Sequence, residues 1–380
     1  MSAQDEIAIV GAAESDLGQV APGMTPMDLA AQASLRALEE AGLALSEVDG
    51  LFCATSQARF APMMLAEYLA IDPAYIDGTQ IGGSSFVSHV GHAVAAIRQG
   101  LCSVALIAYG STQRSVSRAQ ASPPDFNPYE TPFRPMMPVS AYALAAARHM
   151  HCYGTTREDL AEVAVAARAW AALNPKAWDQ APLSVADVLA APMLADPLGL
   201  RDCCLALDGG GAIVLTSARR AADLAKPPVQ VLGYGEAIGH GSISNMPDLT
   251  TTAAVASGRR AFGQAGLSVG DVDVVSLYDA FTITPILFLE DLGFCAKGEG
   301  GAFVRGGALA PGGRLAVNTN GGGLSYNHPG MYGLLGIIEC VRQLRGEAGA
   351  RQVASPGVAL AHGNGGTLSS QCTLLLGRAA

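Results

Sequence analysis

Short apolar runs alternate with amphipathic stretches along the chain, and this pattern predicts strands that alternate with helices. Residues 7–12, Ile-Ala-Ile-Val-Gly-Ala, have the composition of a buried strand that ends in a turn. In the segment 26–41, apolar residues recur at spacings of three and four, which predicts a helix with a buried stripe of Met27, Ala31, Leu35 and Leu38. Gly42 stands where a helix C-cap is expected. This order of elements is typical of an α/β protein.

The chain contains an internal repeat. Segment 41–51, Ala-Gly-Leu-Ala-Leu-Ser-Glu-Val-Asp-Gly-Leu, matches segment 265–275, Ala-Gly-Leu-Ser-Val-Gly-Asp-Val-Asp-Val-Val. In both copies a glycine-capped helix leads through Val-Asp into an apolar strand. Three further elements recur in the same order, namely a glycine turn with a helix (82–100 and 321–346), a strand ending in glycine (104–110 and 358–363) and a closing strand (209–215 and 369–376).

Two copies of one strand–helix alternation predict two α/β halves related by pseudo-symmetry. We assign residues 1–240 to the first half and residues 250–380 to the second. Residues 111–205 have no counterpart in the second half, and they include a proline-rich stretch at 122–138 and a helix pattern at 157–174. We expect this segment to form an inserted domain that covers the functional site, because long excursions inside compact domains are usually functional. A passive surface excursion is the alternative.

Composition and charge exclude several classes of protein. Charged residues make up only 15% of the chain, against ~25% in a typical soluble domain, so we expect part of the surface to be hidden in an oligomer interface. A net charge of −10 without a Lys/Arg cluster argues against nucleic-acid binding. No apolar run reaches the ~18–20 residues of a membrane span, and residues 1–6 lack the basic segment of a signal peptide. We expect a cytoplasmic protein.

The spacing of cysteine and histidine predicts neither a disulfide framework nor a metal centre. The eight cysteines are scattered and include no C-x-x-C pair. His89 and His92 are spaced to share a helix face, but a third ligand is missing. The cluster of His149, His151 and Cys152 leads to the same conclusion. We therefore expect no bound metal.

The strongest chemical signal lies in residues 320–333, Asn-Gly-Gly-Gly-Leu-Ser-Tyr-Asn-His-Pro-Gly-Met-Tyr-Gly. His328 precedes a proline in this glycine-rich loop and is suited to general acid or base catalysis, because the pKa of histidine is near neutral. The glycine turns at 82–83 and 321–323 precede helices, so their backbone N–H groups are suited to an anionic intermediate or a thioester oxygen. Ordinary turn formation is the alternative for these glycines.

These motifs resemble the thiolase superfamily, and in particular its sterol-carrier-protein-type branch. The resemblance covers essentially all 380 residues. The matching segments are the Gly-Gly-x-x-x-x-x-His-Pro motif at 321–329, Tyr-Asp-Ala-Phe at 278–281 in place of a His-Asp or Asn-Glu pair, and the loop-domain segments 153–161 and 174–175. The resemblance implies a duplicated five-layer αβαβα fold with an inserted loop domain. It also implies acyl-CoA substrates, with coenzyme A as part of the thioester and no bound cofactor, and a homodimer joined near residues 104–109.

The chain departs from the thiolase pattern at the nucleophile. The position of the thiolase cysteine falls on Gly83, or on Ser84 with a shift of one residue, and the second catalytic cysteine falls on His362. Tyr278 enters the His-Asp or Asn-Glu motif. With these changes the chain resembles the cysteine-less thiolase-like aldolases, in which tyrosines are proposed as catalytic. Members of that group commonly work with a small partner subunit that bears a zinc ribbon and an OB-fold.

Retro-aldol cleavage of a β-hydroxyacyl-CoA needs a base for the hydroxyl proton and an oxyanion site for the enolate, but no covalent acyl carrier. We expect Tyr278 to be the base or proton relay, together with His328 and His362. Of the two tyrosines that flank His328, we favour Tyr326 over Tyr332. The expected oxyanion and nucleophile positions are Gly83, Ser84, Gly322 and Gly365. A packed strand-end tyrosine is the alternative for Tyr278, and helix capping is the alternative for Ser84.

Two other functions stay open beside the aldolase. One is a 3-ketoacyl-CoA thiolase, an acetyl-CoA acyltransferase, with an atypical nucleophile. The other is a non-catalytic thiolase-like subunit of a hetero-complex. Alkylation by iodoacetamide separates an acyltransferase that needs a thiolate from an aldolase that does not.

Overall fold

The computed structural model describes residues 6–116, 120 and 127–379, and its ten main strands form one hydrogen-bonded ladder. The order is β10-β9-β11-β12-β8-β1-β7-β4-β2-β3. The first-half strands are β1 (Ile7–Glu14), β2 (Gly50–Cys53), β3 (Tyr75–Asp77), β4 (Val104–Ser111) and β7 (Gly209–Ser217). The second-half strands are β8 (Val229–Ile238), β9 (Val274–Leu277), β10 (Ala316–Val317), β11 (Val358–Gly365) and β12 (Ser370–Arg378).

The two halves of this ladder have the same internal pattern. In each half three strands run parallel and two join antiparallel: β3, β2 and β4 with β7 and β1, and β10, β9 and β11 with β12 and β8. The halves meet where β1 pairs with β8 antiparallel through Ala8–Gln230 and Ile9–Val229. The expected pseudo-symmetry is therefore present, although the two half-sheets are joined edge to edge.

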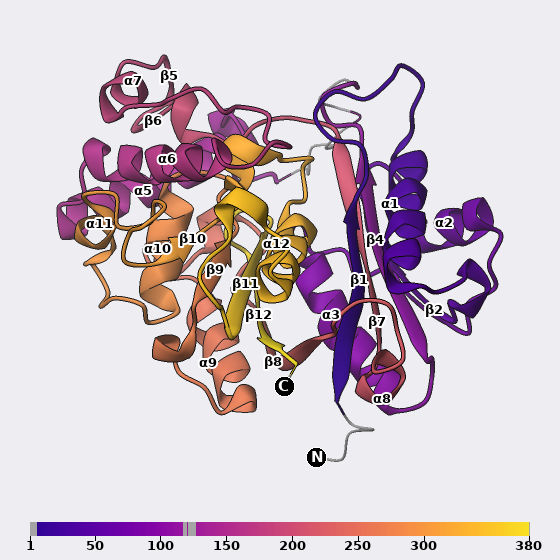
Figure 1. Ribbon diagram of the computed structural model, residues 1–380. Coiled ribbons are helices and arrows are strands. Elements are labelled where there is room, and N and C mark those ends of the chain that lie inside the picture. The colour runs from indigo at the N-terminus through magenta and orange to yellow at the C-terminus, as the bar shows by residue number, and fades with distance from the viewer. Residues whose placement is uncertain (1–5, 117–119, 121–126, 380) are drawn as a thin grey trace.

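The half-sheets fold over one another and helices fill the space between and outside them (Figure 1). The central helices α3 (Ser85–Arg98) and α12 (Gly333–Arg345) contact each other and strands of both halves. On the outer faces lie α1 (Pro26–Ala41) and α2 (Ala61–Leu69) for the first half, and α9 (Ala254–Ala265) and α10 (Ile283–Asp291) for the second. The layers are helix, sheet, helix, sheet, helix, which is the expected five-layer αβαβα fold.

The segment between β4 and β7 forms a separate layer over the end of the second half (Figure 1). It contains α5 (Val139–Tyr153), α6 (Arg157–Ala171), α7 (Val185–Leu189), β5 (Met193–Ala195) and β6 (Leu198–Gly199). Two further short α-helices of the described residues are α8 (Ala218–Ala221) and α11 (Gly300–Val304). Of the proline-rich stretch at 122–138, residues 122–126 lie outside the described residues. The domain boundaries that we assign stay a prediction.

The repeated helix ends follow from local capping signals. Thr25 forms a capping box with Asp28 at the start of α1, and Gly42 ends the helix in the left-handed conformation with φ 72°. Gly266 ends α9 in the same way with φ 67°. In α1 one expectation is wrong: the side chain of Leu35 is exposed, and Ser34 is buried instead. The buried face of a straight helix drifts relative to a strict three–four spacing, so Leu35 turns outward.

The expected dimer contact at residues 104–109 is also wrong as placed. β4 is hydrogen-bonded to β2 on one side and to β7 on the other, so it cannot pair with a second copy of the chain. The free edge of the first half is β3.

In the described part of the chain, no helix combines the length and the apolarity needed to cross a membrane.

Candidate active site

The two central helices begin next to each other at the middle of the molecule. Gly83 lies just before α3, and Tyr332 is the N-cap of α12. The approach is so close that a Cβ at Gly333 would lie 2.2 Å from the carbonyl oxygen of Gly83. β9 ends at Leu277, so the next residue, Tyr278, enters this junction. Each half of the fold therefore contributes a helix N-terminus to one place, and the second half adds a tyrosine.

Tyr278 occupies the space in front of Gly83. A Cβ at position 83 would lie 2.1 Å from Cε2 of Tyr278 and 2.5 Å from its hydroxyl oxygen. Non-bonded carbon atoms do not approach so closely, because attraction is optimal at ~3.5–4.0 Å. Any side chain at position 83 therefore competes with the ring of Tyr278 for the same volume. A phenol ring thus fills the space at Gly83, where the resemblance to thiolases predicts the nucleophile position.

The hydroxyl of Tyr278 is bound to the turn that precedes α12. It donates to the carbonyl of Gly330 at 3.2 Å and accepts from the N–H of Tyr332 at 3.1 Å. Burial raises the pKa of Tyr278 well above its usual value, although the Tyr332 N–H acts in the opposite direction. Tyr278 is thus a neutral phenol near pH 7, held at the N-terminus of a helix whose dipole favours negative charge.

His328 lies beside Tyr278 with an unpaired nitrogen. The two rings meet edge to face, with centroids 5.4 Å apart. Nδ1 of His328 accepts from the N–H of Gly330 at 3.3 Å, so the hydrogen-bond network assigns the ring proton to Nε2. This Nε2 is buried and has no hydrogen-bond partner among the described residues. Burial lowers the pKa of His328 to about 4. The result is a neutral imidazole with a free N–H donor.

Of the two tyrosines that flank His328, Tyr332 contacts the pair and Tyr326 does not. The ring of Tyr332 is parallel to that of His328, with centroids 6.2 Å apart, and edge-on to Tyr278 at 5.8 Å. The hydroxyl of Tyr326 instead donates to Oε1 of Glu14 at 2.9 Å. The preference for Tyr326 is therefore not supported. A π-helical turn over 322–326 rotates Tyr326 away from the site.

The side chain of His362 points away from Tyr278 and His328, although its carbonyl accepts from the N–H of Tyr278 at 3.1 Å. Neighbouring residues of a strand face opposite sides of the sheet, and Gly363 faces the start of α3, where its Cβ would lie 2.9 Å from Cα of Ser84. His362 therefore faces the outer layer. There its ring packs on Phe288 of α10 with centroids 4.6 Å apart.

Both ring nitrogens of His362 are already in use. Nδ1 lies 3.0 Å from Oγ1 of Thr373 and Nε2 lies 2.9 Å from Oε1 of Gln371. Burial lowers the pKa of this ring to about 4. The expected convergence of three residues is reduced to two, and His362 is left out of the mechanism below.

The other expected positions have structural contacts. Ser84 Oγ donates to the carbonyl of Ile81 at 2.9 Å and lies 2.5 Å from Ser370 Oγ, so its hydroxyl is not presented to a substrate. Gly365 packs on the same carbonyl, because a Cβ at position 365 would lie 1.7 Å from the oxygen of Ile81. At Gly322 a Cβ would lie 2.0 Å from Oδ2 of Asp279. The glycine turns are thus close-packed against one another around the site, and their role as oxyanion donors stays a prediction.

Two residues that are not among the expected site residues, Asp279 and Cys204, also lie at this place. Asp279 accepts from the N–H of Gly323 at 2.6 Å and of Leu324 at 3.3 Å, and burial raises its pKa to about 7. The N–H of Cys204 donates to the carbonyl of Ala280 at 2.9 Å, next to the Tyr278–Asp279 segment, and burial raises the pKa of its thiol. Asp279 is visible in sequence as the neighbour of Tyr278. For Cys204 we find no sequence signal.

The described residues contain no cluster of three His, Cys, Asp or Glu side chains that could hold a metal ion. His92 pairs with Asp77 through Nδ1 and Oδ2 at 2.6 Å, and His89 lies 3.0 Å from the carbonyl of Thr79. The two histidines thus have separate structural partners.

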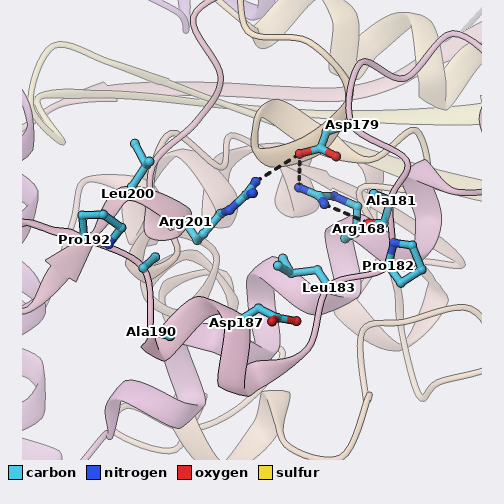
Figure 2. Close-up of a pocket in the computed structure, with 11 residues that line it drawn as sticks. Arg168, Asp179, Ala181, Pro182, Leu183, Asp187, Ala190, Pro192, Leu200 and Arg201 are labelled. Atoms are coloured by element: carbon cyan, nitrogen blue, oxygen red, sulfur yellow. Dashed lines mark hydrogen bonds and ion pairs between the residues drawn. The ribbon is translucent and has the colours of Figure 1, made fainter.

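A pocket of about 480 Å³ adjoins the π-helical turn on the loop-domain side (Figure 2). Arg168 and Arg201 both donate to Oδ2 of Asp179, at 2.6 and 3.1 Å. Arg168 also donates to Ser325 Oγ at 3.0 Å, which connects the pocket to the loop of His328. The side chain of Arg201 is 44% exposed, so its guanidinium could hold a phosphate or carboxylate group of a ligand.

Comparison with known proteins assigns the chain to a family. Residues 235–378 match the model of the thiolase C-terminal domain-like family. Over 367 residues the chain is 34% identical to the 17-hydroxy-3-oxo-4-pregnene-20-carboxyl-CoA lyase of Mycobacterium tuberculosis, covering 90% of this chain and 92% of the relative. The chain belongs to the thiolase superfamily. It also shares 32% identity over 378 residues with the acetyl-CoA acetyltransferase of Methanothermobacter thermautotrophicus, with 95% and 97% coverage.

The solved structures agree with this assignment to the thiolase superfamily. The Ltp2-ChsH2(DUF35) aldolase superposes with a TM-score of 0.88 at 31% identity, covering 98% of each chain. The resemblance to the aldolase-like members of the sterol-carrier-protein-type branch is thereby confirmed.

Proposed function

We propose that this protein is a thiolase-fold lyase that cleaves β-hydroxyacyl-CoA thioesters by a retro-aldol reaction, without a covalent cysteine intermediate. The observation that carries the proposal is the filling of the nucleophile position by the ring of Tyr278, which leaves no room for a side chain at Gly83. The names of the relatives, a CoA-thioester lyase and an aldolase, support the same reaction class.

The reaction needs one relayed proton and one stabilised oxyanion. The hydroxyl proton leaves the β-oxygen, the Cα–Cβ bond breaks, and its electron pair passes to the thioester as an enolate. The new carbonyl compound departs, and a proton returns to Cα to give a shortened acyl-CoA. One proton leaves and one arrives, so a single relay group completes the cycle.

We assign the oxyanion donor to Nε2–H of His328, because this donor is buried, unpaired and fixed in its tautomer. A preorganised donor of this kind is worth roughly 10²–10³ in rate. We assign the relay to Tyr278, whose phenolate would be stabilised by the N–H of Tyr332 and the N-terminus of α12. Burial keeps Tyr278 a neutral phenol, so in the cleavage direction its own proton passes to Cα of the forming enolate while its oxygen accepts the β-hydroxyl proton. One proton leaves the phenol and one arrives, and the phenolate is only transient.

The assembly and location belong to the same proposal. We propose a homodimer, a cytoplasmic location and a small zinc-ribbon and OB-fold partner subunit. The solved Ltp2-ChsH2(DUF35) aldolase supports the partner, because its name contains a second component. The substrate thioester brings coenzyme A, and the proposal includes no other cofactor.

A cleavage assay with purified protein and β-hydroxyacyl-CoA substrates of increasing bulk tests the proposal. The His328→Ala variant is expected to lose about 10²–10³ in turnover, since the enolate loses its donor. The Tyr278→Phe variant is expected to lose about 10²–10⁴. Substrate affinity should change little in either case. A variant that retains full turnover contradicts the assigned role.

The acyltransferase is the second candidate, and the observation that favours it is the backbone hydrogen bond of Cys204 to Ala280 at 2.9 Å, which brings a cysteine next to the segment of Tyr278. A buried thiol with a raised pKa is a poor nucleophile. We therefore expect the Cys204→Ala variant to keep its lyase turnover. Loss of turnover in a folded Cys204→Ala protein, together with an acyl-cysteine detected by mass spectrometry, would establish the acyltransferase instead.

A further inference from the structure

The turn from Pro329 to Tyr332, which follows His328, is held by two phenol hydroxyls from opposite halves of the molecule. Tyr278, at the end of β9, donates to the carbonyl of Gly330 and accepts from the N–H of Tyr332. Tyr109, on β4 of the first half, donates to the carbonyl of Pro329 and accepts from the N–H of Met331 at 3.1 Å. Each hydroxyl bridges a carbonyl and the N–H two residues later, and the two bridges are offset by one residue.

This arrangement accounts for four backbone groups that neither a helix nor a sheet pairs. The turn lies before the first residue of α12, Gly333, and outside every strand. Its residues are buried or nearly so, and Gly330 has φ 94°, a left-handed conformation that has to be held in place. A buried backbone group without a partner costs about 1–3 kcal/mol. The two hydroxyls therefore determine the shape of the turn.

The 329–332 turn also determines which nitrogen of His328 carries the proton. The N–H of Gly330 donates to Nδ1 of His328, which leaves the proton on Nε2. Gly330 lies between Pro329 and Met331, which Tyr109 holds, and its own carbonyl is held by Tyr278. A shift of the turn would move the Gly330 N–H away from Nδ1 and remove the reason for a single tautomer.

We propose that Tyr109 is a positioning residue for His328: its hydroxyl holds the 329–332 turn so that Nε2–H remains the free donor. Tyr109 is suited to a permanent role. It is 1% exposed, and its ring packs on Phe86 of α3 with centroids 4.8 Å apart. Tyr278 must release its hydrogen bond to the carbonyl of Gly330 whenever it relays a proton, whereas Tyr109 keeps both of its bonds to the turn during that step. The kinetic part of this inference rests on the proposed lyase function, whereas the tautomer does not.

The test is the ring state of His328 in ¹⁵N-histidine-labelled protein. The chain has seven histidines, and the signal of His328 is assigned as the one that is lost in a His328→Gln sample. Wild type is expected to show a single Nε2–H tautomer. The Tyr109→Phe variant is expected to show a mixture of tautomers, a turnover lowered about 10-fold or more and a KM within about 2-fold of wild type, since only one tautomer presents the donor.

The matched control is Tyr234→Phe, which also removes a hydroxyl hydrogen bond, here to Glu236 on β8, outside the site. It is expected to keep the wild-type His328 signal. If Tyr109→Phe does not fold, 3-fluorotyrosine at position 109 replaces it as the variant. Fluorination weakens the hydroxyl as an acceptor, so hydrogen exchange of the Met331 amide should quicken while that of Tyr332 does not.

The outcomes separate the two proposals. A wild-type tautomer in Tyr109→Phe, or unchanged exchange at Met331 in the fluorinated protein, overturns the positioning role whatever the enzyme catalyses. A shifted tautomer in a protein that shows no lyase turnover keeps the positioning role and removes the proposed function.

Discussion

At the scale of single residues, the site depends on the missing side chain of Gly83, because the ring of Tyr278 occupies that space. Gly83 and Tyr278 belong to different halves and are far apart in sequence, yet no side chain at the first is compatible with the ring of the second. The volume of the Tyr278 ring alone excludes a nucleophilic side chain at position 83, whatever the pKa of the phenol.

Adding a methyl group at Gly83 should therefore damage the protein, and removing the ring should repair it. We expect Gly83→Ala to lower the free energy of unfolding by about 1–3 kcal/mol or more, as overpacked cores do. In the double variant Gly83→Ala/Tyr278→Ala the loss should be clearly smaller than the sum of the single losses. Urea denaturation measures all three.

Gly263→Ala in α9 is the control for this cycle, because nothing lies near its Cβ position and alanine favours a helix. It should leave stability unchanged or raise it by about 0.5–1 kcal/mol. Additive losses in the double variant would contradict the steric pairing of Gly83 with Tyr278.

Buried histidines make the fold sensitive to acid. Burial lowers the pKa of His89, His328 and His362 to about 4, against 6.5 in the unfolded chain. Below pH 6.5 the unfolded state binds protons that the folded state refuses, so stability is complete above pH 6.5 and falls as the pH falls toward 4. By pH 5 each histidine should cost about 2 kcal/mol.

Asp279 acts in the opposite direction, since its raised pKa lets the folded state bind a proton first, and it should return about 2 kcal/mol over the same interval. The net loss from pH 7 to pH 5 should be about 3 kcal/mol by urea denaturation. The His362→Gln variant should show a visibly shallower dependence. A stability that is flat between pH 7 and pH 5 would show that these rings titrate normally.

At the scale of elements, one carboxylate connects parts that lie far apart in the chain. Glu14 at the end of β1 binds Arg342 of α12 through both oxygens and accepts from Tyr326 and from Lys176 of the loop domain. Burial alone would raise its pKa, but the Arg342 guanidinium lowers it to about 2. The ion pair therefore holds the first strand, the second central helix and the turn before His328 together.

The Glu14→Gln variant should be strongly destabilised. The change keeps the size of the side chain but leaves the buried Arg342 without a counter-charge, which typically costs about 3–5 kcal/mol. Glu47→Gln is the matched control, because its ion pair with Arg220 is exposed and contributes at most about 1 kcal/mol. Thermal unfolding compares the two, and equal effects would contradict the connecting role of Glu14.

The sequence predicts features that depend on neighbouring residues. It does not predict contacts between residues that are far apart in the chain. The helix ends at Gly42, Gly266 and Gly346 can be predicted from the glycine itself, and all three glycines have left-handed φ values. The face of β11 on which His362 lies depends on strand register. The partner of Tyr326 is 312 residues away in Glu14. Neither is encoded in the neighbouring residues.

At the scale of the whole molecule, the free edge of the first half is the place for a second copy. β3 ends the ladder, and its Ile76 is 52% exposed. On α2, which packs on the adjacent strand β2, Met63 and Tyr68 are 62% and 53% exposed. An uncovered edge strand with apolar neighbours is prone to association. We place the proposed homodimer here rather than at β4.

Charge at this edge should separate the subunits. We expect wild type to sediment as a dimer and Ile76→Lys to shift toward the monomer, since two like charges would face each other across the symmetry axis. Val255→Lys on α9 is the control, with a side chain that is 44% exposed on the opposite half. A dimer that persists in Ile76→Lys would place the interface elsewhere.

The close approach of Gly83 and Tyr278 also constrains the history of the two halves. Residues 83 and 278 come from different halves, and the side chain that is allowed at one position depends on the other. A lineage that acquired the tyrosine while position 83 still carried a side chain would have passed through an overpacked, poorly folding ancestor. This backbone can therefore accept a tyrosine at position 278 only together with, or after, a glycine at position 83.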